Sequence, residues 1–599
     1  MSLAAGTEDR TRAGGAPTTP TTRLGKVLAE LSAAHASGQT TVLSGSAVND
    51  VFVADLSADL DGQPTLARLP EALAAWSARQ RRRTLLYSYG PGLIALTPDH
   101  RHAATAMPAE LLPAARRGGQ VDVAADVSAI LDGLSQPGQM PTLLLVDWAE
   151  LAIPNDPTDP SGRPLLEHLA TVGIDPAWAG AGHQLVLLDH SGGIDARLTA
   201  SIGVHVHFLG RPSEHERVQA AQLLAAGTRR HLHLGPGLDA DQFGRLTGGQ
   251  MLDALVRARD SSTAQDPITA ARIVASKAGE IRHQAGDVVR VLSDPDRRFD
   301  GSVAGLPQVR LLVEESTLVG QSIRAILVGP PGVGKSYAAV AIANQLGVPC
   351  VSLGLVRNMY VGESERQLEQ AIDLIRAYAP VVVFLDEADQ GALGSRKTAV
   401  DSSDVNRTMR GRLFEAFGDN GDDQGISVVL ASNAVFGLDD ATLSRFEPIP
   451  VLYPTAFELA NILLIDAHRH HIPTDDGSIR AAVQSYAEQP LAMSGRDIVR
   501  IRQDATLRAR WAGRADITGA DVARAMDDSL HHPTPDAEIQ ILHSLLATRT
   551  MRRLPWVAAA YYDEPTEPPA YLKEVLDANG APNPERIAAR LRDLDAGVP

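Results

Sequence analysis

The sequence is poor in residues that mark several protein classes. Its 599 residues include a single cysteine, Cys350, and only 4% aromatic side chains. One cysteine cannot form an intramolecular disulfide, and no zinc-type Cys/His spacing accompanies it. We therefore expect Cys350 to be a small buried residue in a protein of a reducing compartment. The His-Glu-x-x-His pattern is also absent, which argues against a fused zinc protease.

Long apolar runs are missing as well. No stretch approaches the roughly 18–20 apolar residues needed to cross a bilayer. The N-terminus carries Glu8, Asp9 and Arg10, where a secretion signal has a basic segment followed by an apolar one. We therefore expect a cytoplasmic protein without a membrane span.

Basic residues are fewer than acidic ones. The chain has 55 Lys and Arg against 72 Asp and Glu, a formal net charge of −17. Such an excess repels a phosphate backbone and argues against nucleic acid as the main partner. A short run of arginines goes against this trend, namely Arg79, Arg81, Arg82 and Arg83. We interpret it as a solvated helix end, with a local basic lining as the alternative.

The remaining composition is globular, with 44% hydrophobic and 21% charged residues. The chain is too long for one hydrophobic core, so several domains are expected. The pattern predicts a disordered tail at 1–22, an α/β domain at 23–260, a helical linker at 261–298, an α/β domain at 299–453, a helical lid at 454–532 and a C-terminal extension at 533–599. Within the linker, helical spacing of apolar residues predicts one helix over about 268–291.

Short apolar segments alternate with helical patterns in both α/β domains, the order of a parallel sheet with crossover helices. Strands are predicted at 41–43, 84–89, 142–146 and 184–188, and then at 325–328, 350–353, 381–385 and 426–431. Helices are predicted at about 66–78, 336–346 and 364–378, and the lid is predicted from helical segments at 456–468, 479–489, 495–510 and 519–530. The predicted fold class is therefore α/β with a helical subdomain.

A glycine-rich segment between the strand at 325–328 and the following helix has the Walker A pattern. It comprises Gly329, Pro330, Pro331, Gly332, Val333, Gly334, Lys335 and Ser336, and Tyr337 follows it. The glycines let successive backbone N–H groups point at phosphates at the helix N-terminus. Lys335 would add a positive charge, and Ser336 a hydroxyl for Mg²⁺. The segment predicts an ATP site.

A carboxylate pair follows the strand at 381–385. Asp386 and Glu387 would lie at the carboxyl end of a central strand, where open α/β sheets bind their ligands. We expect Asp386 to hold Mg²⁺, directly or through water, and Glu387 to orient and deprotonate the attacking water.

Two further motifs follow the carboxylate pair: Ser432-Asn433 ends the next strand, and Leu443-Ser444-Arg445-Phe446 lies beyond it. Together with the Walker A segment and the carboxylate pair, these motifs make residues of about 299–530 resemble an AAA+ ATPase of the classical AAA clade. The resemblance implies that Asn433 polarises the water and that Arg445 acts as an arginine finger on a neighbouring subunit. Many members have a second arginine where this chain has Thr442.

Two flanking segments also resemble this family. Val303 and Ala304 stand where the family packs its chain against adenine, and Arg496 stands at the position of the second sensor. Arg496 could alternatively be a surface residue at a helix start.

A further segment resembles the family's pore loop, in which an aromatic residue grips a threaded polypeptide. It contains Met359, Tyr360 and Val361. Exposed apolar residues on a loop are costly unless they contact something. The alternative is that Tyr360 fills a gap in the core.

The first α/β domain departs from the pattern. Asp147 follows an apolar strand but lacks a directly following acidic residue, and Ser44-Gly45-Ser46 is only a turn. The domain resembles the degenerate first module of tandem AAA proteins of bacteria and plastids, with an unrelated α/β adaptor as the alternative.

The resemblance implies an ATP- and Mg²⁺-dependent ATPase that forms a ring, expected to be a hexamer, and remodels or unfolds an unidentified protein partner. The alternative is a nucleotide-gated switch or scaffold that binds its partner through the first half without threading it. The two hypotheses differ at Tyr360.

Overall fold

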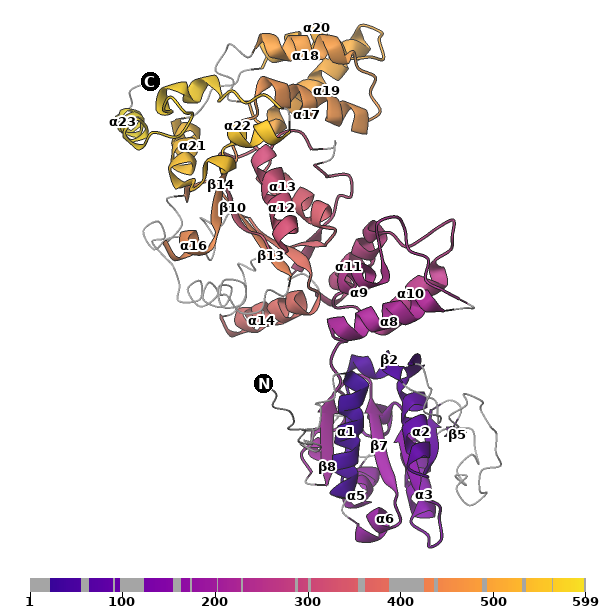
Figure 1. The fold of residues 1–599 in the computed structure, drawn as a ribbon. Coiled ribbons are helices and arrows are strands. Elements are labelled where there is room, and N and C mark those ends of the chain that lie inside the picture. The colour runs from indigo at the N-terminus through magenta and orange to yellow at the C-terminus, as the bar shows by residue number, and fades with distance from the viewer. Residues whose placement is uncertain are drawn as a thin grey trace, which may run out of the picture. The chain divides into compact units, whose positions relative to one another are not determined.

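The structure is a computed structural model of the whole chain. It describes residues 22–54, 64–89, 92–96, 123–154, 163–172, 175–201, 203–227, 230–285, 289–299, 303–353, 361–386, 425–435, 440–486, 493–529, 535–562 and 564–596. The chain divides into two compact units, residues 1–268 and 269–599. Figure 1 shows the elements of each unit, and the two are described separately below.

The first unit is built on a six-stranded sheet with the order β5-β4-β6-β7-β1-β8. Only β5, which pairs with β4, runs antiparallel to its neighbour. The strands are β1 (Thr40–Ser44), β4 (Arg83–Ser88), β5 (Gly92–Leu96), β6 (Thr142–Val146), β7 (Gln184–Asp189) and β8 (Val204–Phe208). A separate hairpin pairs β2 (Val51–Ala54) with β3 (Thr65–Arg68). Strands β1, β6 and β7 are buried throughout, as expected for parallel strands covered on both faces.

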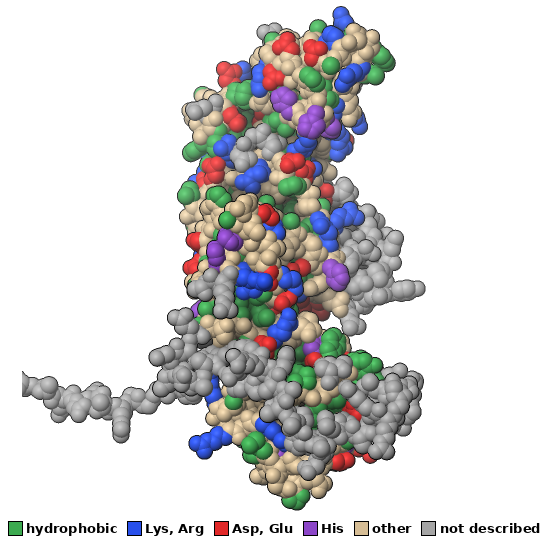
Figure 2. Space-filling model, turned by 90° about the vertical axis from the view of Figure 1, so that its right-hand side faces the viewer, with side chains coloured by type: hydrophobic (Ala, Val, Ile, Leu, Met, Phe, Trp, Pro, Cys, Tyr) green, Lys and Arg blue, Asp and Glu red, His purple; other side chains and the backbone are tan. Residues whose placement is uncertain are grey.

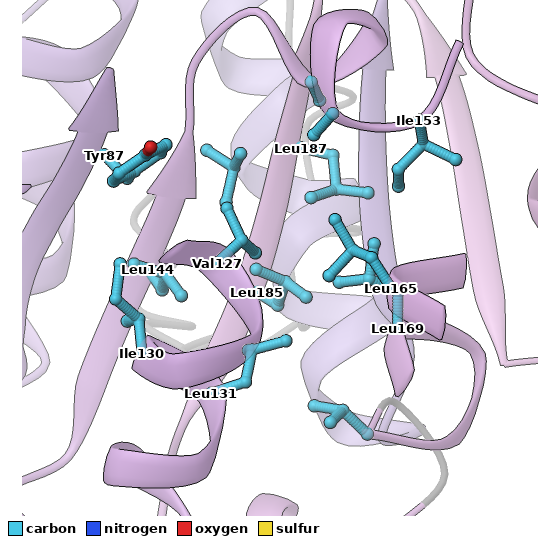
Figure 3. Close-up of a cluster of buried hydrophobic side chains, with 14 of the residues drawn as sticks. Tyr87, Val127, Ile130, Leu131, Leu144, Ile153, Leu165, Leu169, Leu185 and Leu187 are labelled. Atoms are coloured by element: carbon cyan, nitrogen blue, oxygen red, sulfur yellow. The ribbon is translucent and has the colours of Figure 1, made fainter. Parts of the chain in front are cut away.

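Helices cover both faces of this sheet. Alternate side chains of β6 and β7 pack against α3 (Val123–Leu134) and α5 (Arg163–Val172) on one face, as Figure 3 shows. The intervening side chains pack against α1 (Arg23–Ala36) and α2 (Leu69–Arg79) on the other. The further helices of this unit are α4 (Ala149–Ala152), α6 (Pro176–Gly180), α7 (Ala196–Thr199), α8 (Glu214–Ala226), α9 (Ala240–Leu246) and α10 (Leu252–Ser261), with a 3-10 turn η1 (Ser46–Asn49) after β1.

The second unit contains another six-stranded sheet, with the order β14-β10-β13-β12-β11-β9. Its strands are β9 (Val289–Leu292), β10 (Arg324–Val328), β11 (Cys350–Leu353), β12 (Val381–Leu385), β13 (Ile426–Ser432) and β14 (Glu447–Pro450). Only β9 is antiparallel to its neighbour. One face packs against α12 (Pro307–Val319) and α13 (Lys335–Leu346), and the other against α11 (Ala270–Ala285) and α14 (Val361–Ala377).

Both sheets arrange their parallel strands in the same order. Counted along the chain within each unit, the order is fifth, first, fourth, third, second, with the antiparallel strand beyond the second. Strands β1, β4, β6, β7 and β8 of the first unit thus correspond to β10, β11, β12, β13 and β14 of the second. The sheets share a topology, although the sequence shows no convincing repeat.

Helices form the rest of the second unit. The lid has its own apolar core and consists of α17 (Ala456–Arg469), α18 (Asp476–Ser485), α19 (Gly495–Trp511) and α20 (Gly519–Asp527). The C-terminal extension contains α21 (Pro535–Ala547), η4 (Met551–Arg553), α22 (Pro555–Ala558), η5 (Ala559–Tyr561), η6 (Ala570–Val575) and α23 (Pro584–Asp595). It shares a core with Leu452, which follows β14.

The predicted α/β class with parallel strands and a helical lid is confirmed. Two details were wrong. The helix predicted over 268–291 ends at Ala285, and β9 follows it as an edge strand of the second sheet. The helix predicted from residue 66 begins only at Leu69, because the preceding residues pair in the hairpin as β3. The C-terminal extension predicted at 533–599 is helical in part and is packed around an apolar core. The predicted disordered tail, apart from Thr22, lies outside the described residues.

Cys350 has the buried environment that the sequence predicts. Cys350 is buried and free, and burial raises the pKa of its thiol to about 12, so it is an inert core residue. Acidic and basic side chains are interspersed on the face that Figure 2 shows, without a broad area of one sign. No helix in the described part of the chain is long and apolar enough to cross a membrane.

Candidate nucleotide site

A cavity of about 560 Å³ lies in the second unit where α13 begins. Seven of the nine segment residues singled out by sequence line it: Pro331, Gly332, Val333, Gly334, Lys335, Ser336 and Tyr337. Asp386, at the end of β12, and Asn433, at the end of β13, line it too. The fold therefore brings together residues far apart in the sequence at the carboxyl edge of the sheet, as expected for this class.

The loop is shaped by glycines at two demanding positions. Gly334 is the N-cap of α13 and has a φ of 100°, a left-handed value that side chains disfavour. Gly329 lies so close to the chain after β14 that a Cβ would come 1.9 Å from the carbonyl oxygen of Val451. The loop thus leaves the N-terminus of α13 open to the cavity, and such a terminus attracts anions.

Lys335 is 8% exposed, and its ammonium donates hydrogen bonds to the loop and to Asn433. Its Nζ donates to the carbonyl oxygens of Gly329 at 2.7 Å and Pro330 at 2.9 Å, and to Oδ1 of Asn433 at 2.8 Å. These three acceptors hold the charge beside the helix N-terminus. Gly329 and Pro330 therefore contribute to the site through their carbonyl groups.

Two oxygen ligands lie next to each other at the same edge. The Ser336 hydroxyl donates to Oδ2 of Asp386 at 3.4 Å. A hydroxyl and a carboxylate are the hard oxygen donors that Mg²⁺ takes in proteins, usually together with water and phosphate oxygens. The pair therefore fits a Mg²⁺ ion. The described residues contain no group of three or more His, Cys, Asp or Glu side chains that could hold a metal by themselves.

A second wall is formed by residues that precede β10. Val303 and Ala304, both expected at the site, line the cavity with Leu306. Beside them Arg297 lies over the Tyr337 ring, 4.3 Å from its centroid. The Tyr337 hydroxyl also accepts a hydrogen bond from Nη2 of Arg469 at 3.3 Å. These contacts join the strand side of the cavity to the lid.

The lid contributes Arg496, which lines the cavity from the first turn of α19. That helix begins with a capping box, in which Ser494 and Asp497 satisfy each other's backbone N–H groups. Ser494 lies against the phosphate loop, since a Cβ on Gly332 would come 2.9 Å from its hydroxyl oxygen. The start of α19 is thereby fixed on the loop.

Arg445 and Val361 are not among the described residues that line the cavity. Arg445 ends α16 (Asp440–Arg445). Val361 is the first residue of α14 and not a loop residue as expected. Glu387, Met359 and Tyr360 lie outside the described residues.

Sequence reasoning missed one side of the cavity. Glu458 lines it from α17, and Trp556, Glu564 and Glu567 line it from the C-terminal extension. Glu458 had a local signal, because Thr455-x-x-Glu458 is a capping-box sequence. Removal from water raises the pKa of Glu458 despite hydrogen bonds from Thr455. The extension residues had no local signal.

The corresponding edge of the first unit is different. Asp147 and His190 follow β6 and β7, the counterparts of the strands that precede Asp386 and Asn433. His190 Nε2 and Asp147 Oδ1 are 2.6 Å apart, and the His190 ring stacks on Trp148 with centroids 4.2 Å apart. After β1 the chain enters η1 and has no glycine-rich loop with a lysine. The two sheet edges therefore occupy the same place in the topology, but the edge of the first unit lacks the glycine-rich loop and the lysine of the second.

Known proteins with similar sequences include an ATPase subunit and an ATP-dependent enzyme by name. The family described as "ATPase family associated with various cellular activities (AAA)" matches residues 325–451, from β10 to just after β14. The chain is 26% identical over 226 residues to the A-like 1 form of the katanin p60 ATPase-containing subunit from Rattus norvegicus. It is 30% identical over 211 residues to the ATP-dependent zinc metalloprotease FtsH of Acidothermus cellulolyticus.

The two alignments cover 36% and 34% of this chain, and 45% and 30% of the relatives. The chain thus spans less than half the length of these relatives. The glycine-rich loop and the family match both fall on the second unit. The match identifies residues 325–451 as an AAA ATPase domain.

Proposed function

We propose that the second unit binds ATP with Mg²⁺ and hydrolyses it. The observation that carries this proposal is the convergence of Lys335, Ser336, Asp386 and Asn433 on the N-terminus of α13. The β- and γ-phosphates would take the place of the carbonyl groups and Asn433 around the Lys335 ammonium. Phosphoryl transfer depends mainly on positioning and on stabilising charge, and this arrangement supplies both.

The catalytic roles follow from position. Ser336 and Asp386 would hold Mg²⁺, which neutralises charge on the phosphate oxygens. Glu387, next to Asp386 in the sequence, would accept a proton from the water that attacks the γ-phosphorus. Asn433, freed from Lys335 when phosphate binds, would orient that water. The bond from the γ-phosphorus to the bridging oxygen then breaks, leaving ADP and phosphate.

We further propose that the active form is a homo-oligomer, with a hexameric ring as the expected form. Arg445 lies at the end of α16 and outside the cavity lining among the described residues, so a role at a phosphate requires a neighbouring copy. One relative is named an ATPase-containing subunit, which agrees with assembly. The metalloprotease part of the other relative's name is not extended to this chain, because the alignment covers 30% of that protein.

The proposed work of the oligomer is remodelling of a protein partner through the segment Met359, Tyr360 and Val361, which ends at the first residue of α14. The first unit would be an AAA-like module that docks the partner without hydrolysing ATP. Its strand order matches that of the second unit, and the Asp147–His190 pair occupies the edge where a nucleotide site would lie. A nucleotide-gated switch that binds without threading is the rival.

The test of hydrolysis uses two variants of the full chain. Lys335→Ala should abolish ATP binding, whereas Glu387→Gln should bind ATP and stall before hydrolysis. Equilibrium binding of a fluorescent ATP analogue and release of phosphate separate the two effects. Wild-type turnover by Lys335→Ala would overturn both the assigned site and the proposed inactivity of the first unit.

The test of threading uses Tyr360→Ala. A gripping residue predicts retained ATPase activity and stability with loss of partner remodelling. A core role predicts a cavity costing roughly 3–5 kcal/mol and a lower melting temperature. Full remodelling by a stable Tyr360→Ala protein would favour the switch.

A further inference from the structure

The C-terminal extension forms part of the nucleotide cavity. Two short helices and the chain after them, over residues 555–569, supply several lining residues, among them Trp556, Glu564 and Glu567. The family match ends at residue 451, well before this segment. The wall is therefore a feature of this chain outside the matched domain.

Buried contacts fix this wall to the sheet and to α12. Arg553, 3% exposed, forms ion pairs with Glu315 of α12 at 2.7 Å and with Glu447 of β14 at 2.8 Å. Just before Glu564, the Tyr562 hydroxyl donates to Oε2 of Glu314 at 2.9 Å. The extension is therefore held just before the lining segment and within it.

Apolar packing and a hydrogen bond of Trp556 also fix this segment. Trp556 is 5% exposed, and its indole N–H donates to the carbonyl of Gly580 at 3.1 Å. Its ring shares an apolar core with Leu452 and with Leu572 and Val575 of η6. Because Leu452 follows β14 directly, this core joins the extension to the sheet that carries the phosphate loop.

The extension places an acidic side chain, Glu564, close to Glu458 of α17 in the cavity wall. Glu458 contacts the segment that contains Ala304, since a Cβ on Gly305 would come 2.6 Å from its Oε1. Removal from water is the main reason that the pKa of Glu458 is raised, and the negative charge of Glu564 adds to the shift. Glu564 is thus close enough to Glu458 to influence it.

Lys335 and Arg496 lie with the loop that would hold the phosphates, as does the carboxylate of Asp386. Glu458 and Glu564 lie together beside the segment that contains Ala304. Ionised carboxylates only accept hydrogen bonds. Of the parts of ATP, the nucleoside alone offers donors, through its exocyclic amine and ribose hydroxyls, while the triphosphate offers acceptors.

We propose that the C-terminal extension is a wall of the nucleoside end of the cavity, and that Glu564 is a specificity residue that accepts a hydrogen bond from the nucleoside of ATP. The proposal rests on the proposed nucleotide site. It assigns binding of the phosphates to the loop and selection of the nucleoside to the extension, which lies outside the AAA domain.

The experiment compares two ligands on the full chain with Mg²⁺. ATP probes both ends of the cavity, and inorganic tripolyphosphate probes the phosphate end alone. Loss of a hydrogen bond to a charged group corresponds to a roughly tenfold or greater loss of affinity. Glu564→Ala should therefore weaken ATP about tenfold or more and change tripolyphosphate binding by less than about twofold. Glu564→Gln, which keeps an acceptor of the same size, should lose less.

The controls separate this inference from the proposed site. Lys335→Ala should weaken both ligands, and if it weakens neither, the phosphate site itself is wrong. Glu574→Ala removes an exposed glutamate of the same extension and should leave both affinities unchanged. Unchanged ATP binding by Glu564→Ala, or an equal loss of ATP and tripolyphosphate binding, would overturn the inference. An equal loss would mean that the residue acts on the fold.

Discussion

The attachment of the C-terminal extension depends on one buried arginine, and its removal is the most telling stability experiment. The side chain of Arg553 is 4% exposed and pairs with two carboxylates, Glu315 and Glu447, which are 28% and 30% exposed. Truncation to alanine leaves both carboxylates without their common cation. Breaking a buried ion pair costs roughly 3–5 kcal/mol. Because water reaches both carboxylates in part, we expect the lower end, about 3 kcal/mol.

This loss converts into a thermal shift. At roughly 2–4 °C per kcal/mol for units of this size, the melting temperature of the second unit should fall by roughly 6–12 °C in Arg553→Ala. Calorimetry of the full chain measures it, and the transition that rises on addition of ATP identifies the second unit. ATP affinity should fall as well, since the wall that carries Glu564 is loosened.

The neighbouring residue is a matched control. Arg552 also faces Glu315, with Nε 3.4 Å from Oε1, but its side chain is 53% exposed. An exposed pair contributes about 0–1 kcal/mol, so Arg552→Ala should melt within a few degrees of the wild type. Equal melting temperatures for the two variants would refute the claim that Arg553 anchors the extension.

Three further predictions concern the site and its assembly. Gly329→Ala places a Cβ 1.9 Å from the Val451 carbonyl oxygen, so the loop must move and ATP binding should be lost; unchanged affinity in a binding titration would contradict this. Burial raises the pKa of Glu458 in the folded protein above the ordinary value of 4.5, which applies to the unfolded chain. The contribution of Glu458 to stability is therefore fully present below pH 4.5 and is lost as the pH rises through the folded pKa. Glu458→Gln should therefore flatten the dependence of stability on pH in denaturant titrations above pH 4.5, and an unaltered slope would argue against it. Mixing Arg445→Ala with Lys335→Ala subunits should restore some phosphate release if the arginine acts across an interface, whereas full activity of a strict monomer in light scattering would exclude that role.

The phosphate side of the site was predictable because its signals are local. A glycine-rich loop between a strand and a helix fixes where Lys335 and Ser336 stand, and a short apolar strand that ends in a carboxylate places Asp386 at the same sheet edge. The bounds of β12 were predicted correctly, since five consecutive buried apolar residues are typical of a central parallel strand.

Edge strands were harder to predict. Strand β14 contains Pro448 and Pro450, which argue against a strand, yet it lies at the end of the sheet, where proline is tolerated. Strand β9 was read as the end of a helix. Its short Val-Arg-Val-Leu segment fits either structure, and pairing with β11 decides between them.

The sequence by itself determined the family, the phosphate loop and the alternation of strands and helices, because these depend on residues adjacent in the chain. Only the tertiary structure decided the side of the cavity that the C-terminal extension forms. Trp556 and Glu564 reach it because Arg553 and a shared apolar core attach the extension to α12 and β14. Such contacts join residues more than a hundred positions apart, and a cavity wall formed by long-range packing has no spacing or motif by which the sequence alone could reveal it.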